Sequence, residues 1–178
     1  MYNLISKKIR GLSPEINIAT FCVLLLSFGF YLEYFQSLSP CPLCLLQRLF
    51  YLMILLINIS SFFLLRAVRY KIIFLCISTF FSLLGAITAG RQVWLQHLPS
   101  DQIPECGPGV VYLLEGYPLQ KVLEIIYRGS GSCAETLWEF LGLSIAGWSA
   151  IFFVFLLTYS LASAKRLYTN QQICSACT

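Results

Sequence analysis

Four long apolar stretches constrain this chain more than any other feature of its sequence. They cover about residues 16–35, 45–65, 72–89 and 143–161. Each comes close to the roughly 20 residues that an α-helix needs to cross the hydrocarbon core of a bilayer. Formal charges are nearly absent from the stretches, apart from Glu33 and Arg48, which both lie near one interface. The pattern predicts an all-α membrane protein, a bundle of four transmembrane helices.

The composition agrees with a membrane protein and excludes an ordinary soluble domain. Of the 178 residues, 58% are hydrophobic and 11% are charged, against roughly 45 to 50% apolar and about 25% charged in soluble domains. We find no internal repeat and no second region of soluble character, so residues 1–178 are expected to form a single integral membrane domain. We expect the protein to be embedded in the lipid bilayer and to have no nucleic acid as a partner.

The distribution of Lys and Arg predicts the orientation of the four helices. By the positive-inside rule, the side richer in these residues faces the cytoplasm. Both termini would then be cytoplasmic, and the loops at about residues 36–44 and 90–142 would face outward. Eight of the twelve basic residues flank the stretches on one side: Lys7, Lys8, Arg10, Arg66, Arg69, Lys71, Lys165 and Arg166.

Two further segments need an interpretation. The first apolar stretch exceeds the usual 7 to 15 residues of the apolar segment within a signal peptide and lacks an A-x-A-like cleavage site, so we interpret it as a retained helix. The long second outer loop contains residues 110–127, which are too polar to span but rich in large apolar side chains. They are expected to form a short interfacial helix that starts after Pro118, or else a surface helix packed within the loop.

The eight cysteines divide by their position in this topology. Cys22 and Cys76 lie within apolar stretches, where a lone cysteine usually behaves as a small hydrophobic residue. Cys174 and Cys177 form a C-x-x-C in the C-terminal tail, which we interpret as reduced, inert thiols. The other four are outward, where disulfides are permitted and three pairings are possible. These are Cys41, Cys44, Cys106 and Cys133.

The outer C-x-x-C stands where the second apolar stretch begins, in the sequence SPCPLCLLQR. Pro42 suits the first position of a helix, which places Cys41 near the N-cap and Cys44 in the first turn. The N-terminal end of a helix favours the thiolate form of Cys44. Arg48 lies four residues further on the same helical face, either reaching toward lipid headgroups or stabilising the Cys44 thiolate and donating to an electron acceptor in the lipid.

His97 is the one histidine of the chain, just beyond the third apolar stretch in the sequence RQVWLQHLPS. A lone histidine at this depth is ordinarily a polar group at the level of the lipid headgroups. Its ring is also at the right depth to donate a hydrogen bond to a quinone oxygen. Both interpretations remain open from the sequence.

Together these features resemble the DsbB family, the quinone-linked thiol oxidases of the bacterial inner membrane. The resemblance covers essentially the whole chain. It rests on the outer C-x-x-C followed by Arg48, on Cys106 and Cys133 in a long second outer loop, and on GSCAETLWEFLGLS before the fourth helix. It implies that Cys41–Cys44 and Cys106–Cys133 are redox-active disulfides on the periplasmic side, and that Cys41–Cys44 passes electrons to the quinone, which is ubiquinone or menaquinone. Arg48 and His97 are our candidates for binding the quinone. The C-terminal Cys174/Cys177 pair has no counterpart in the pattern.

The resemblance also implies a reaction. A DsbA-like periplasmic protein of thioredoxin fold attacks Cys106, Cys133 is released and attacks Cys41, and Cys44 leaves as a thiolate that reduces quinone. A low-pKa leaving thiol speeds such exchange. Flexible residues 129–132 before Cys133 are suited to the movement that the relay requires.

Three alternatives compete with this interpretation. A membrane reductase of the vitamin K epoxide reductase type also carries a C-x-x-C, but late in the chain rather than between the first two helices. A Cys₄ zinc site is chemically possible, although Cys106 and Cys133 are 27 positions apart instead of forming a second close pair, and we expect no metal. Structural disulfides would leave Arg48 without a purpose.

Overall fold

The architecture is a bundle of four long helices. The structure, a computed structural model, describes residues 13–36, 41–64, 67–99, 118, 120–121, 131–134 and 139–176. The long helices are α2 (Pro14–Gln36), α3 (Pro42–Leu64), α4 (Val68–Gln96) and α8 (Ile145–Ala176). Within these ranges, four helices are long and apolar enough to cross a membrane. The prediction of an all-α protein with four transmembrane helices is confirmed.

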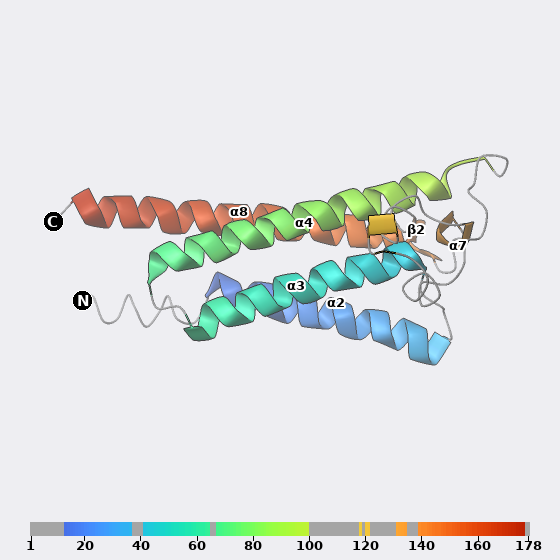
Figure 1. The fold of residues 1–178 in the computed structure, drawn as a ribbon, viewed down its shortest axis with the longest axis horizontal. Helices are drawn as coiled ribbons and strands as arrows, with labels where there is room; N and C mark the ends of the chain where they lie inside the picture. Colours follow the sequence, from blue (N-terminus) through green and yellow to red (C-terminus); the bar gives the residue numbers. More distant parts are fainter. Residues whose placement is uncertain are drawn as a thin grey trace.

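Successive long helices run in opposite directions, and Figure 1 shows α4 lying along α8 and α3 lying along α2. The most extensive packing is between α4 and α8, and α3 connects α4 to α2. A short helix, α7 (Gly131–Ala134), lies at the end of the bundle where α3 begins. This end of the bundle carries the candidate site.

A small antiparallel hairpin leads into α8. It pairs β1 (Glu139–Phe140) with β2 (Leu143–Ser144) through a turn in which Leu141 has a φ of 54° and Gly142 a φ of 75°. Two central residues with positive φ are characteristic of a type I′ turn, which matches the twist of the strands. The Ser144 side chain then accepts a hydrogen bond from the Gly147 backbone N–H at 3.2 Å, so this serine caps α8.

The helix ends differ from the apolar stretches seen in the sequence. Helix α4 continues past Gly90 to Gln96, because the residues after Gly90 include good helix formers that outweigh the cost of about 1 kcal/mol for one glycine. Helix α8 continues to Ala176 and so includes the backbone of Cys174. Of the expected interfacial helix at residues 110–127, only Pro118, Gln120 and Lys121 are among the described residues, so that prediction is not tested.

The core of the bundle combines close packing with hydrogen bonds between helices. The Tyr51 ring stacks on Phe153 with centroids 4.1 Å apart, and its hydroxyl lies 3.1 Å from Ser149 Oγ. Asn58 on α3 donates to Ser78 Oγ on α4 at 2.8 Å. Such hydrogen bonds help to hold the helices together, because apolar side chains in a membrane gain little from packing against another helix instead of against lipid tails.

Large apolar side chains cover the outside of the bundle. Leu24 is 63% exposed, Phe63 75% and Leu161 55%. A soluble protein would seldom expose so many, whereas a lipid-facing surface requires them. Cys22 is buried in the core as expected for a small hydrophobic residue, and Cys76 lies exposed on the apolar outer surface.

Candidate active site

The start of α3 carries the C-x-x-C pair of Cys41 and Cys44. Cys41 precedes the helix, and Pro42 is its first residue, where the missing N–H and the fixed φ of proline are favourable. The Cys41 carbonyl accepts the Leu45 N–H at 3.1 Å, and Cys41 Sγ accepts the Cys44 backbone N–H at 3.3 Å. Cys41 therefore caps α3 through its sulfur, in the position where serine or aspartate usually caps through oxygen.

Cys41 and Cys44 are both reduced in the structure. Their Sγ atoms lie 2.9 Å apart, with the Cys41 thiol donating to the Cys44 sulfur. A disulfide requires about 2.05 Å, so a small closing movement, with the loss of two electrons and two protons to an oxidant, would form the bond. Cys44 also lies at the positive end of the helix dipole, which favours its thiolate form.

Two buried glutamines lie against this pair. Gln92 of α4 donates from Nε2 to Cys41 Sγ at 3.3 Å and to Cys44 Sγ at 3.2 Å. Its Oε1 accepts a hydrogen bond from Gln47 Nε2 at 2.8 Å. Both glutamine residues are only 4% exposed. The sulfurs of the C-x-x-C are therefore enclosed by an amide pair that joins α3 to α4.

Helix α7 brings Cys133 to the same place. Cys133 is fully buried in a cluster with Cys41, Leu43 and Leu95, against which Cys44 also packs. A hydrogen bond joins Cys133 to Cys41. This bond, then the bond to Cys44, and then burial raise the pKa of the Cys41 thiol. Cys41 is therefore held as a protonated thiol between two other sulfurs.

The arrangement has a direct chemical meaning. Thiol–disulfide exchange requires an attacking sulfur to reach the sulfur that it attacks. Cys133 contacts Cys41, and Cys41 contacts Cys44. The three sulfurs thus form a continuous path from α7 to the start of α3, along which a disulfide bond can move. Cys106, the fourth predicted residue, lies outside the described residues.

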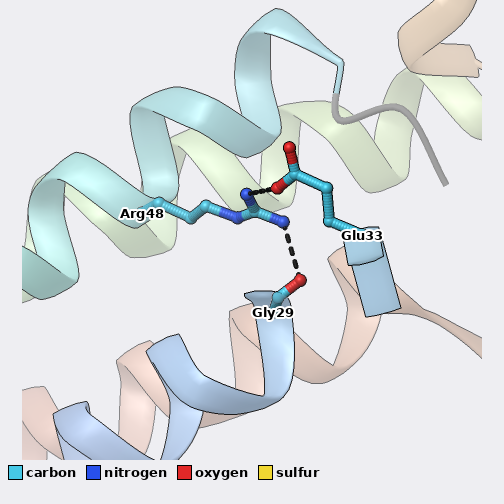
Figure 2. A network of polar contacts seen from close by, with 3 residues as sticks. All are labelled: Gly29, Glu33 and Arg48. Atoms are coloured by element: carbon cyan, nitrogen blue, oxygen red, sulfur yellow. Dashed lines mark hydrogen bonds and ion pairs between the residues drawn. The ribbon is translucent and has the colours of Figure 1, made fainter. Parts of the chain in front are cut away.

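Arg48 points toward α2. Figure 2 shows its guanidinium forming an ion pair with Glu33 and donating to the Gly29 carbonyl, the second bond being 2.9 Å long. The guanidinium also lies 5.3 Å from the centroid of the Phe30 ring. Among the described residues, its hydrogen bonds thus go to α2 and not to Cys44. Stabilisation of the Cys44 thiolate by direct contact with Arg48 is therefore not seen, whereas its remaining N–H donors are available to an acceptor.

His97 follows the last residue of α4 and is exposed. Its Nδ1 lies 2.8 Å from the Val93 carbonyl. Because a carbonyl only accepts, Nδ1 carries the proton, and Nε2 of the neutral ring is an acceptor. A neutral His97 can therefore accept a hydrogen bond from a quinol hydroxyl, but donation from Nε2 to a quinone oxygen requires the charged ring.

The sequence did not identify Gln92 or Gln47 as residues of the site. Gln92 was assigned to the second outer loop, because the apolar stretch of the third helix ends before it. The signal that would have found both is an amide side chain inside an apolar stretch (Gln47) or shortly after one (Gln92), because such a group in a membrane helix needs a partner. Gln47 also stands three residues after Cys44 and so shares its helical face.

Four membrane-crossing helices with a path of contacting cysteine sulfurs at one end define a membrane-embedded thiol–disulfide oxidoreductase. The chain belongs to the DsbB family, because the family model described as "Disulfide bond formation protein DsbB" matches residues 15–163. The family resemblance predicted from the sequence is confirmed, and with it a role in disulfide bond formation.

Relatives of this family align over most of their length. Disulfide bond formation protein B of Nitrosococcus oceani is 40% identical over 145 residues, which cover 79% of this chain and 83% of the relative. The protein of the same name from Marinobacter nauticus is 42% identical over 154 residues, covering 83% and 88%. That of Hahella chejuensis is 42% identical over 130 residues, covering 73% and 79%.

Proposed function

We propose that this protein oxidises the dithiol of a periplasmic, DsbA-like protein of thioredoxin fold and passes the two electrons to membrane quinone. It would act in the bacterial inner membrane, with the start of α3 on the periplasmic side. The observation that carries the proposal is the contact of Cys133 with Cys41, which itself contacts Cys44. This path joins the cysteine of the second outer loop to the C-x-x-C at the membrane boundary.

The exchange steps follow from this path. A thiolate of the partner attacks Cys106 in the Cys106–Cys133 disulfide, which forms a mixed disulfide and releases the Cys133 thiolate. Cys133 attacks Cys41 and breaks the Cys41–Cys44 bond, and Cys44 leaves as a thiolate. The second thiol of the partner then releases the oxidised partner from Cys106, and the Cys106 thiolate recovers Cys133 from Cys41.

The protein is then left with Cys41 and Cys44 reduced, as in the structure. Re-forming their bond releases two electrons and two protons, which reduce quinone to the quinol. The residues available to hold the quinone fit this chemistry. Arg48 has five N–H donors, of which its described hydrogen bonds engage two, at the same end of α3 as Cys44. His97 offers its Nε2 atom from the end of α4.

The test is quinone reduction by the purified protein in detergent, supplied with a reduced DsbA-like partner and, in separate assays, ubiquinone or menaquinone. Turnover should stop in Cys44→Ser and in Cys106→Ser. Cys76→Ser is the matched control, because Cys76 lies exposed on the outer surface of α4. Absence of turnover by the unaltered protein with both quinones, or full turnover by either serine variant, would refute the proposal.

A further inference from the structure

We propose that Gln92 is a positioning residue that makes the Cys41–Cys44 disulfide a stronger oxidant, because its amide binds the sulfurs more tightly when they are reduced. The inference rests on the proposed function in one respect, that Cys41 and Cys44 cycle between dithiol and disulfide. It concerns the equilibrium of that pair and requires neither the quinone nor the soluble partner.

The geometry of Gln92 is specific to the two sulfurs. One amide group lies 3.3 Å from Cys41 Sγ and 3.2 Å from Cys44 Sγ through the same nitrogen, whose two hydrogens allow one bond to each. The Gln47 Nε2 atom lies 2.8 Å from Gln92 Oε1. Since an amide nitrogen donates, this contact keeps the oxygen of Gln92 toward Gln47 and its NH₂ group toward the cysteines.

The amide serves both protonation states of Cys44. As a thiolate, Cys44 accepts the hydrogen bond from Nε2. As a thiol, it can donate to Oε1 of the same side chain, which lies 3.7 Å away. Gln92 brings no formal charge of its own, so it stabilises a thiolate without attracting another carboxylate or anion into the buried site.

The strength of these hydrogen bonds depends on whether Cys41 and Cys44 are reduced or joined in a disulfide. A thiolate is an ionised acceptor, and hydrogen bonds to ionised groups are roughly twice as strong as neutral ones. The sulfurs of a disulfide are neutral and weak acceptors. Because Gln92 is buried, water does not replace the bonds that its NH₂ group loses when the disulfide forms. The side chain therefore favours the reduced pair over the oxidised pair.

Other described side chains do not take this role. Arg48, the cation four residues after Cys44, directs its hydrogen bonds to Glu33 and Gly29 of α2. In the described ranges, the side chains that donate to the Cys44 sulfur are Cys41 and Gln92. Cys41 is itself a partner in the disulfide, so of these two donors Gln92 is the one that lies outside the bond.

The experiment measures the equilibrium of the Cys41–Cys44 disulfide with reduced and oxidised glutathione, using alkylation and mass analysis of the peptide that contains both cysteines. Gln92→Met keeps the length of the side chain and removes both donors. We expect the equilibrium constant for reduction of the disulfide to fall about tenfold, a shift of about 30 mV toward a more reducing potential. Gln92→Glu should shift it further in the same direction, because its carboxylate repels a thiolate.

The matched control is Gln96→Met. Gln96 lies one turn further along α4 and accepts a hydrogen bond from Ser144 at 2.6 Å instead of binding a sulfur. Its equilibrium constant should stay within twofold of the unaltered protein. A second readout is the ultraviolet absorbance of thiolate in the reduced protein near neutral pH, which should fall in Gln92→Met and remain in Gln96→Met.

Equal shifts in Gln92→Met and Gln96→Met, or no shift in both Gln92 variants, would overturn the inference. If one Gln92 variant fails to fold, the other decides, since each removes the donor. Failure of the proposed function is distinguishable, because the glutathione equilibrium would still shift in a protein that never reduces quinone.

Discussion

The guanidinium of Arg48 forms an ion pair with the carboxylate of Glu33 and thereby joins α3 to α2 at the end of the bundle that carries the cysteines. Their side chains are 22% and 35% exposed, so water screens the pair only in part. The pair fixes where the remaining N–H groups of Arg48 point. Through this ion pair, Glu33 would influence the binding of quinone although it lies outside the cysteine cluster.

Replacing Glu33 should weaken the binding of quinone. In Glu33→Gln the charge-assisted bond is lost while the Gly29 carbonyl still accepts from Arg48. Partly exposed ion pairs contribute up to about 1 kcal/mol, so we expect the KM for quinone to rise up to about fivefold with little change in the KM for the soluble partner. Steady-state kinetics at varied quinone concentration measure this. Glu139→Gln in β1 is the control, and an unchanged KM in Glu33→Gln would contradict the role of the pair.

Cys133 and Cys41 should cross-link readily when their other partners are removed. Because a hydrogen bond already joins them, the double variant Cys44→Ser/Cys106→Ser should form a Cys41–Cys133 disulfide on mild oxidation. Peptide mass analysis without reduction identifies the linked peptides. Cys22 of α2 is buried in a different cluster and should remain reduced in the same sample. Recovery of Cys41 and Cys133 as separate thiols would show that the two do not meet in solution.

The raised pKa of Cys41 predicts the pH dependence of its alkylation. Only the thiolate reacts, so an ordinary cysteine approaches its maximal rate above pH about 8.5, whereas Cys41 should still be gaining reactivity there. In Cys44→Ser, the contact with Cys133 remains. Adding Cys133→Ala removes the largest cause of the shift, so the alkylation profile of Cys41 should move to lower pH. Superimposable profiles for the two variants would contradict this assignment.

Gly85 is a position where even a methyl group should destabilise the bundle. A Cβ at this residue would overlap Cε1 of Phe153, which is fully buried and stacked on Tyr51. We expect Gly85→Ala to lower the free energy of unfolding by about 1 to 3 kcal/mol, the usual cost of overpacking. Titration of the detergent-solubilised protein with a denaturing detergent measures the loss.

Gly90→Ala is the matched control on the same helix, because a Cβ there meets nothing within 4 Å. Alanine in a helix interior is more favourable than glycine by about 0.5 to 1 kcal/mol, so this variant should be as stable as the unaltered protein or slightly more so. Partial recovery of Gly85→Ala by Phe153→Leu would assign the loss to this one contact. Equal stability of the two alanine variants would refute it.

The sequence was sufficient to predict the four helices, because apolar runs of this length have few other solutions in a bilayer. It was insufficient for their ends. Gly90 suggested a break in α4, but a helix tolerates one glycine when helix formers follow it. The β1–β2 hairpin also escaped prediction, since its strands are two residues long and Leu141 gives no sign of a positive φ.

The candidate site was predictable to different degrees for its different residues. The spacing of Cys41, Pro42 and Cys44 correctly predicted a helix start at Pro42. Arg48 was recognised as a charge near the membrane boundary with Glu33 close to the same interface, but their pairing depends on how α2 packs on α3. Gln92 was missed because its approach to the cysteines is a tertiary contact over 48 positions of sequence. The catalytic roles of the four cysteines and the quinone-binding roles of Arg48 and His97 stay predictions.

The sulfur cap of α3 ties the helix to the position of Cys41. While Cys41 Sγ lies beside Cys44, it also accepts the Cys44 backbone N–H. In the proposed relay Cys41 bonds to Cys133, and a movement of its sulfur away from Cys44 would leave that N–H without its acceptor. Losing a helix cap typically costs about 1 kcal/mol. The first turn of α3 would therefore favour the return of Cys41 to Cys44 after each transfer.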